Sequence, residues 1–445
     1  MSLNRRHFIT VAAAAAALPA TAAPLSKLGI DATTLGVRPG APDDQSHAVQ
    51  RAIDRAAKAR TPLVLPPGVY RCGDLNLPAG ANLVGARGAT RLVFTRGRSL
   101  IAGEHADTVS LEGLILDGKG QTIPDGRGLA HMNDVQKLRI DACEVIDAAG
   151  NGILLDACDG EVTRTIITKA ADTALFSRDG RGLLIIGNII RDSGNGGIRV
   201  WQSEKKADGS TIADNRVEDT AARSGGSGQN GNAINVFRAG NVIVRNNHIR
   251  GAAFSAIRGN AASDIQILGN NCSALDEVAI YSEFGFQGAI IAENIVDGAG
   301  IGVSVTNFNE GGRLATVRGN IIRNLAARRP GTPPEDEGIG ITVEADAAVT
   351  GNIVENAANT GISAGWGRYM RDIAITGNIV RVTDYGIALS VTAGAGGAVV
   401  TGNLITGARR GAVVGVEYRK AVTGDLARGG QNPYPQIKIA DNQVS

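Results

Sequence analysis

The sequence predicts an all-β fold, a single-stranded parallel β-helix or solenoid with an α-helix that caps its N-terminal end. The first observation is an asparagine that recurs ten times between positions 188 and 442, at spacings of 23 to 39 positions. An aliphatic residue stands two places after the asparagine in nine of these copies. A repeat of this length indicates one supersecondary unit that is stacked on copies of itself.

The second observation is that each repeat contains three short segments with the pattern of β-strands. One follows the asparagine, a second begins nine or ten residues later, as at 197–200, and a third precedes the next asparagine, as at 242–244. Alternation over four or five positions is typical of a strand with one buried face. Three such strands without a helical period form one coil of a β-helix. We expect the asparagine to take the left-handed conformation at a corner and to bond its counterpart in the next coil, and we assign it no chemistry.

The composition suits a narrow, aliphatic core. The chain has 60 glycines, 4% aromatic residues and a formal net charge of +2. Glycine allows tight turns, while branched aliphatic side chains fill strands. The near-neutral charge, without a dense basic run, predicts no nucleic-acid partner. A chain of 445 residues is long enough for two or three ordinary domains, but a solenoid grows along a single axis and needs no such division. The oligomeric state is not predicted.

The four cysteines form no CxxC pair. Cys272 occupies the aliphatic slot of the repeat, so we expect a small buried hydrophobe there. A disulfide between Cys143 and Cys158 is the open alternative for the early coils.

The N-terminus has the features of an export signal. Arg5 and Arg6 lie in a segment that resembles the twin-arginine motif, and Ala20-Thr21-Ala22 offers a cleavage site. The apolar stretch between them, 9–18, is too short to span a bilayer permanently. We therefore expect residues 1–22 to be removed, the twin-arginine translocase to be a partner during export, and the mature protein to be periplasmic or secreted.

The mature chain divides into a cap with the first coils, 23–95, and a repeat domain, 96–445. The cap contains one amphipathic pattern, for which Asp43, Asp44 or Ser46 can act as the helix cap. Its function is to cover the open first coil, which otherwise exposes strand edges and core. The apolar side of this predicted helix consists of Ala48, Val49, Ala52, Ile53 and Ala56.

Residues 31–36, 43–44, 49–53, 65–70, 77–80 and 83–85 resemble the N-terminal segment of pectate-lyase-superfamily proteins. Together with the export signal, the chain resembles a family of twin-arginine-translocated repeat proteins of uncharacterised function. The resemblance covers nearly the whole mature chain and implies a right-handed parallel β-helix. It implies a polysaccharide ligand only weakly, because the superfamily includes lyases, hydrolases, epimerases and non-enzymes.

Stacking predicts two outward rows of side chains on the second strand of each coil. The first row consists of Arg199, Asn235, Arg258, Tyr281, Ser304, Thr342 and Ser363. The second row consists of Trp201, Phe237, Asn260, Glu283, Thr306, Glu344 and Gly365. These rows mix aromatic rings, arginines and carboxylates, as a sugar-binding groove does, although a solvated sheet face remains the alternative. With nearby loops they give the predicted substrate-binding residues, Arg199, Trp201, Asn235, Phe237, Arg238, Tyr281, Asn307, Trp366 and Tyr369.

Two insertions, 224–231 and 328–335, enter the coil at the same point. We expect both to project from one edge and to flank the coils of Arg258, Tyr281 and Asn307. Long loops on one edge of a solenoid often form the walls of a binding cleft, and tolerated surface insertions are the alternative.

The predicted catalytic residues are Glu283, Glu344 and Arg258. Glu283 and Glu344 lie two coils apart, which places their backbones about 9.6 Å apart, within side-chain reach of the carboxyl separation of an inverting glycosidase. A lyase instead needs a cation for the uronate carboxylate, and Arg199 or Arg258 fits that role. The five histidines show no ligand spacing, so no metal site or cofactor is predicted, and calcium is an alternative that no acidic cluster supports.

The sequence therefore predicts an exported parallel β-helix protein that binds an acidic or envelope polysaccharide. Cleavage of that polysaccharide, by a lyase or a hydrolase mechanism, is left open, and so is the question of whether the protein is an enzyme. The alternative is a non-catalytic structural or adhesive envelope protein of the same fold.

Overall fold

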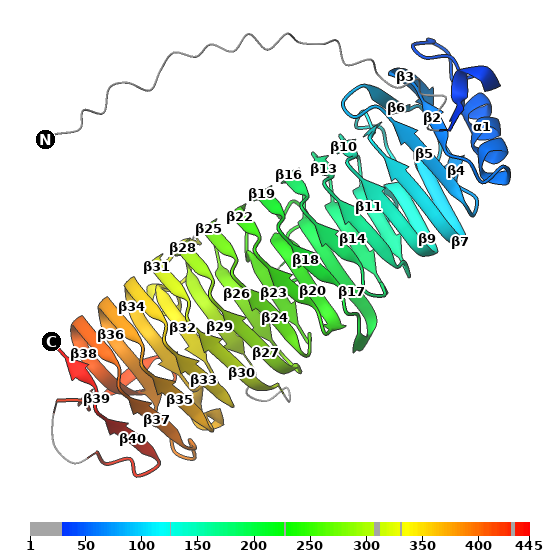
Figure 1. Ribbon diagram of the computed structural model, residues 1–445. Coiled ribbons are helices and arrows are strands. Elements are labelled where there is room, and N and C mark those ends of the chain that lie inside the picture. The colour runs from blue at the N-terminus through cyan, green and yellow to red at the C-terminus, as the bar shows by residue number, and fades with distance from the viewer. Residues whose placement is uncertain (1–28, 125, 227, 307–311, 330–331, 429–431) are drawn as a thin grey trace, which may run out of the picture.

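The computed structural model describes residues 29–445 except 125, 227, 307–311, 330–331 and 429–431. The predicted signal peptide, 1–22, lies outside these described residues. The described chain forms one long parallel β-helix with a helix at its N-terminal end (Figure 1). Nowhere in the described ranges is a helix both long and apolar enough to cross a membrane.

Each coil contributes one strand to each of three parallel sheets, here called faces A, B and C. Face A is formed mainly by β4 (Leu75–Asn76), β11 (Asn151–Asp156), β14 (Thr173–Arg178), β17 (Gly196–Ala207), β20 (Asn232–Gly240), β23 (Ile257–Asn260), β26 (Val278–Glu283), β29 (Ile301–Thr306) and β32 (Ile339–Val343).

Face B follows face A along the chain. It is formed by β1 (Ile30–Asp31), β2 (Leu63–Leu65), β5 (Ala81–Gly85), β12 (Gly160–Thr163), β15 (Leu184–Ile186), β18 (Thr211–Ala213), β21 (Ile243–Arg245), β24 (Ile265–Leu268), β27 (Gln287–Ala292), β30 (Arg313–Arg318), β33 (Ala347–Thr350), β35 (Ile373–Thr376), β37 (Ala398–Thr401) and β40 (Ile437–Ala440).

Face C completes each coil. It is formed by β3 (Gly68–Cys72), β6 (Thr90–Phe94), β8 (Leu114–Asp117), β10 (Glu144–Ile146), β13 (Ile166–Thr168), β16 (Ile189–Ser193), β19 (Arg216–Thr220), β22 (His248–Ala252), β25 (Asn271–Leu275), β28 (Ile295–Ala299), β31 (Ile321–Leu325) and β41 (Gln443–Val444).

Several long strands continue round a corner from one face to the next. β7 (Ile101–Glu112) and β9 (Gly128–Asp141) belong to faces A and B. β34 (Ile353–Ala364), β36 (Ile379–Ser390) and β38 (Leu404–Glu417) belong to faces C and A. β39 (Lys420–Asp425) folds back antiparallel on β38 and covers the outer side of the last coils of face A. Short 3-10 helices lie at Ala32–Leu35, Pro334–Asp336 and Gly367–Tyr369.

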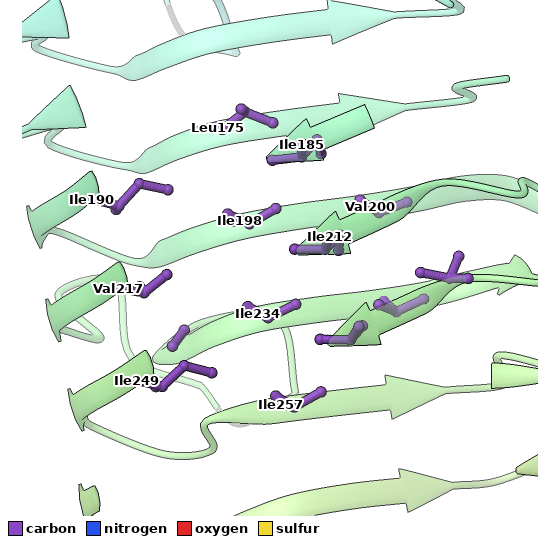
Figure 2. Packing of buried hydrophobic residues seen from close by; sticks show 14 of the residues in the cluster. Leu175, Ile185, Ile190, Ile198, Val200, Ile212, Val217, Ile234, Ile249 and Ile257 are labelled. Atoms are coloured by element: carbon purple, nitrogen blue, oxygen red, sulfur yellow. The ribbon is translucent and has the colours of Figure 1, made fainter. Parts of the chain in front are cut away.

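The core consists of stacked rows of aliphatic side chains, one row or more for each face. Figure 2 shows Leu175, Ile198, Ile234 and Ile257 of face A in one such row. Cys272 continues the face C row of Ile190, Val217 and Ile249, and it is fully buried, as predicted. All four cysteines are free, so the alternative Cys143–Cys158 disulfide is absent from the structure.

The ten asparagines form one continuous hydrogen-bonded ladder at the corner between faces B and C. From Asn188 to Asn403, each side-chain Nδ2 donates to the Oδ1 of the next copy at 2.8–3.0 Å. The predicted ladder is confirmed, but the predicted left-handed conformation of the asparagine is wrong. The residue before each asparagine has positive φ instead, for example Gly187 at 69° and Glu293 at 60°. This preceding residue turns the chain, which leaves the asparagine side chain directed inward.

The predicted cap helix is α1 (Ser46–Lys58), and it lies against the first coils (Figure 1). Asp44 accepts a hydrogen bond from the Ser46 backbone N–H at 2.9 Å, whereas Gln45, at the N-cap position, makes no side-chain cap bond. The predicted apolar side is confirmed: Val49, Ala52, Ile53 and Ala56 are buried and Ala48 is half-buried, packed against the core.

Candidate functional site

The strand register of face A confirms the first predicted row from Arg199 to Ser363 and the second from Trp201 to Thr306, while Glu344 and Gly365 directly follow the last paired residues of their strands. Arg199, Asn235, Arg258 and Tyr281 are consecutive partners in the sheet. The same pairs of strands align Trp201, Phe237, Asn260 and Glu283. Side chains that are up to about 80 positions apart in sequence therefore lie on one surface, with neighbouring coils about 4.8 Å apart.

Three long connections run from face C to face A and project from the same edge. Residues 221–231 join β19 to β20, and residues 326–338 join β31 to β32, which confirms that the two predicted insertions share one edge. A third connection, 118–127, joins β8 to β9. The sequence reasoning missed this third connection because it precedes Asn188, the first asparagine of the repeat, so no register was available there.

A cavity of about 1090 Å³ lies on face A between connections 118–127 and 221–231. No described residue of connection 326–338 lines it, so the expectation that both predicted insertions form the walls of one cleft is not confirmed for the second. The cavity is lined by Ile123, Pro124, Gly126, Ala149, Gly150, Asn151, Ala171, Asp172, Asn195, Arg199, Trp201, Ser224, Gly228, Gln229, Asn230, Asn235, Phe237, Arg258, Asn260 and Phe284.

Arg199 is buried although it points outward from the sheet, because the 221–231 connection covers it. Its Nη2 donates to the Asn230 Oδ1 at 2.8 Å and to the Asn195 carbonyl at 3.2 Å. Its Nη1 lies 3.7 Å from the Asp172 carboxylate, and its Nε has no hydrogen-bond partner among the described residues. Burial lowers the pKa of the Arg199 guanidinium. Arg199 thus anchors the connection over one end of the cavity.

Three aromatic rings stand in a row beside Arg199. Trp201 meets Phe176 and Phe237 edge to face, with ring centroids 5.1 and 5.5 Å apart. The Trp201 Nε1 donates to the Asn235 Oδ1 at 3.2 Å, and the Asn235 Nδ2 donates to the Gly228 carbonyl at 2.6 Å. These bonds fix the orientation of the Trp201 ring, and the half-buried Trp201 and Phe237 present apolar surface to the cavity.

Arg258 lines the cavity, but Glu283, in the next coil, does not. The Glu283 side chain is 1% exposed, and its Oε1 accepts hydrogen bonds from the Arg258 Nε at 2.6 Å and the Asn260 Nδ2 at 2.8 Å. The Arg258 guanidinium also lies over the Tyr281 ring, 4.9 Å from its centroid. Burial raises the pKa of Tyr281 to about 12. In this arrangement Glu283 positions Arg258 and is not directed into the cavity.

Connection 326–338 contributes Arg329 and Glu337 to a group of charged side chains that also includes Arg258 and Glu277. The Arg329 Nη1 donates to Glu277 at 2.8 Å, and its Nε donates to Glu337 at 3.2 Å. Glu277 in turn lies 3.8 Å from Arg258. Burial raises the pKa of the Glu277 carboxyl, and the two arginines oppose that shift.

The other predicted site residues lie away from the cavity lining. Arg238 is exposed at its rim, 4.8 Å from the Phe237 centroid. The Trp366 ring packs against the ring of Tyr418, which lies in the turn after β38, and the two ring centroids are 5.3 Å apart. Tyr369 is the last residue of the 3-10 helix Gly367–Tyr369. Glu344 directly follows β32, and its negative charge acts to raise the pKa of Arg419. Asn307 is outside the described residues.

Sequence reasoning missed several cavity residues. Asp172, Asn195 and Asn230 lie in connections from face C to face A, where the repeat pattern carries no alternation. The sequence signal that could have identified them is their position, a few residues before the outward-facing residue of the same coil. In the described part of the chain, no group of three or more His, Cys, Asp or Glu side chains is arranged to hold a metal ion.

A solenoid of three parallel sheets with a side-chain ladder at one corner defines the class of parallel β-helix proteins. The chain belongs to the family described as the right handed beta helix region, whose profile matches residues 127–228, 151–322 and 206–380, together more than half of the chain. This match confirms the predicted right-handed parallel β-helix. The resemblance to twin-arginine-translocated repeat proteins stays a prediction.

Solved structures with the same architecture share little sequence with this chain. The N-terminal fragment of bacteriophage phi29 gene product 12 is 12% identical with a TM-score of 0.59, over 95% of this chain and 71% of that chain. Tailspike protein 3 of bacteriophage CBA120 is 13% identical with a TM-score of 0.51, over 94% and 62%. The Azotobacter vinelandii mannuronan C-5 epimerase AlgE6 A-module is 16% identical with a TM-score of 0.46, over 93% and 99%. The similarities to the two bacteriophage proteins show the fold alone, and no curated protein matches the sequence.

Proposed function

We propose that the protein binds an acidic or envelope polysaccharide in the face A cavity. The observation that carries this proposal is the lining: the rings of Trp201 and Phe237 lie beside the amides of Asn195, Asn230 and Asn235. Apolar platforms with a few oriented polar groups are what a ligand with hydrophobic faces and a hydroxyl rim requires. The volume of about 1090 Å³ is at the upper end of ligand pockets, which suits a segment of a polymer.

An acidic ligand is supported by Arg238 more than by the buried arginines. Arg199 and Arg258 already have carboxylates within 4 Å, at Asp172 and Glu283, so much of their charge is offset. Arg238 is exposed next to the aromatic row, and its Nη1 donates to the Ser203 carbonyl at 2.8 Å. Among the described residues it has no carboxylate partner. A uronate carboxylate over Phe237 would therefore meet an uncompensated guanidinium.

Binding is supported better than cleavage. Hydrolysis of a glycosidic bond generally requires two carboxyl groups on opposite sides of that bond. Among the described lining residues only Asp172 carries a carboxylate. The predicted acid/base residue Glu283 has its Oε1 bound to Arg258 and Asn260 and does not line the cavity. We therefore propose binding without an assigned catalytic step.

A glycan array followed by calorimetry tests the proposal. We expect the folded protein to bind at least one uronate polymer, such as alginate or polygalacturonate, or an envelope glycan. We also expect Arg238→Ala to weaken binding of an acidic ligand and to leave a neutral one unchanged. Absence of binding to every uronate and envelope glycan, with the fold verified by circular dichroism, contradicts the proposal.

We also propose that residues 1–22 direct the protein out of the cytoplasm through the twin-arginine translocase. Substitution of both Arg5 and Arg6 by lysine, which keeps the positive charge, is expected to leave an unprocessed precursor in the cytoplasm. Cell fractionation and N-terminal sequencing measure the outcome. Normal processing and export of the double variant would remove the twin-arginine assignment while leaving the cavity proposal intact.

A further inference from the structure

A second, smaller pocket lies on face A on the other side of the 118–127 connection. Its volume is about 490 Å³, and Gly126 of that connection lines both this pocket and the larger cavity. The two hollows therefore share one wall. The second pocket is lined by Glu104, Gly126, Arg127, His131, Asn133, Asp156, Ala157, Arg178 and Asp179.

The same outward row of side chains runs through both hollows. Phe237 and Trp201 line the cavity, and the register continues from Trp201 to Arg178, then to Asp156 and Asn133 in the pocket. Each step is one coil, about 4.8 Å, so Asp156 lies about 10 Å from Trp201 along the row. A polymer that follows the row out of the cavity reaches this pocket next.

His131 is held at the base of the pocket with one ring nitrogen unused. Its side chain is 9% exposed, and its Nε2 lies 2.9 Å from Asp156, which also accepts a bond from the Arg178 Nε at 2.7 Å. Burial alone raises the pKa of Asp156, but the hydrogen bonds from His131 and Arg178 outweigh it and lower the pKa. The carboxylate is thus an acceptor, so Nε2 carries a proton, and in the neutral ring Nδ1 is then an acceptor. The Nδ1 atom is buried without a hydrogen-bond partner.

Arg127 supplies a second unmatched group in the same pocket. Its Nε is buried without a hydrogen-bond partner, and no carboxylate of the described residues pairs with its guanidinium. Buried polar groups nearly always have partners, so an unmatched acceptor and an unmatched donor in one pocket indicate a missing polar group. The hydroxyl groups of a sugar can donate to an acceptor such as Nδ1 and accept from a donor such as Nε.

We infer that this pocket is a further subsite that binds one sugar unit of the same polysaccharide, with His131 and Arg127 as its hydrogen-bonding side chains. The inference rests on the proposed function. It implies that the protein recognises an extended chain that occupies both hollows, and that short oligosaccharides fill the cavity alone.

Calorimetry with size-fractionated oligomannuronates and oligogalacturonates, from disaccharide to octasaccharide, tests the inference. We expect the affinity of the unmodified protein to rise with length until both hollows are filled. His131→Ala and Arg127→Ala should each weaken binding of the long oligomers about tenfold, as for the loss of one hydrogen bond to a charged or buried partner, and leave the shortest unchanged. Arg245→Ala, an exposed arginine on face B, is the matched control for loss of positive charge.

The two proposals fail in different ways. If the unmodified protein binds long oligomers and neither Arg127→Ala nor His131→Ala changes affinity at any length, the pocket is not a subsite, and a buried water satisfies its polar groups. If the unmodified protein binds none of these oligomers and no uronate or envelope glycan on the array, the proposed function fails and the subsite fails with it. Because His131 is buried, thermal unfolding of each variant is measured first, and the more exposed Arg127 decides the outcome if His131→Ala does not fold.

Discussion

Substitution of Asn294 by alanine is expected to lower the free energy of unfolding by about 3–5 kcal/mol. Asn294 lies in the middle of the ladder and is fully buried. Its Nδ2 donates to the Asn320 Oδ1 and the Ile267 carbonyl, and its Oδ1 accepts from the Asn270 backbone N–H and Nδ2. Alanine leaves several of these partners unsatisfied in the core, at about 1–3 kcal/mol each.

Chemical denaturation followed by circular dichroism measures this loss, and Asn442→Ala is the control. Asn442 ends the ladder and is half-exposed, so water can replace its bonds, and we expect a loss of about 1 kcal/mol or less. Because stability in a solenoid is a sum over neighbouring repeats, Asn294→Ala should also split the unfolding into two transitions. Equal losses for the two variants would show that the ladder is not a cooperative element.

The sequence predicts the repeat domain well because, in a β-helix, residues at equivalent positions of successive repeats stack directly on one another. Once the asparagines define the coil, any two residues at the same distance from them are neighbours in space. Arg199, Asn235 and Arg258 could therefore be aligned from sequence, and the sheet pairs them in that order. The same reasoning placed Cys272 in the core row.

Features that depend on contacts between turns could not be predicted this way. Connection 118–127 precedes the first asparagine of the repeat, so the repeat could not be used to place its residues beside the cavity. The ion pair between Arg329 and Glu277 joins residues 52 positions apart through a turn rather than a strand. The alignment also placed Glu283 on the outward row, but only side-chain packing shows that Arg258 and Asn260 cover its carboxylate.

Trp366 illustrates the same limit at the C-terminal end. Its position in the repeat resembles that of a groove residue, but β39 folds back on β38 and brings Tyr418 and Arg419 onto its ring. An antiparallel hairpin that closes a solenoid lies outside the repeat, so the repeat period contains no information about it. Trp201 and Trp366 were therefore both predicted to bind substrate, although Trp366 stands one residue after the row position of Gly365, and only Trp201 lines the cavity.

That difference provides a matched pair of variants for the second prediction. Trp201→Ala is expected to weaken polysaccharide binding about 10- to 100-fold, because it removes the central ring of the aromatic row and the contact of its ring with Arg199, 5.3 Å away. Trp366→Ala removes a ring of the same size outside the cavity and is expected to leave affinity unchanged. Trp201→Phe, which retains an aromatic face but is smaller than the indole and loses the hydrogen bond to Asn235, should recover most of the affinity.

Calorimetry with the polymer selected on the array measures all three variants, with thermal unfolding as the check on folding. Both Trp→Ala variants lose edge-to-face ring contacts, at 5.1 and 5.5 Å for Trp201 with Phe176 and Phe237 and at 5.3 Å for Trp366 with Tyr418, so thermal unfolding measures any general destabilisation of each variant. A selective loss for Trp201→Ala therefore reports the site and not the fold. Equal weakening by Trp366→Ala would place the ligand along the C-terminal coils, where Tyr369 and Arg368 also lie. Unchanged binding by Trp201→Ala would remove the aromatic row, and with it the face A cavity, as the place where the polysaccharide binds.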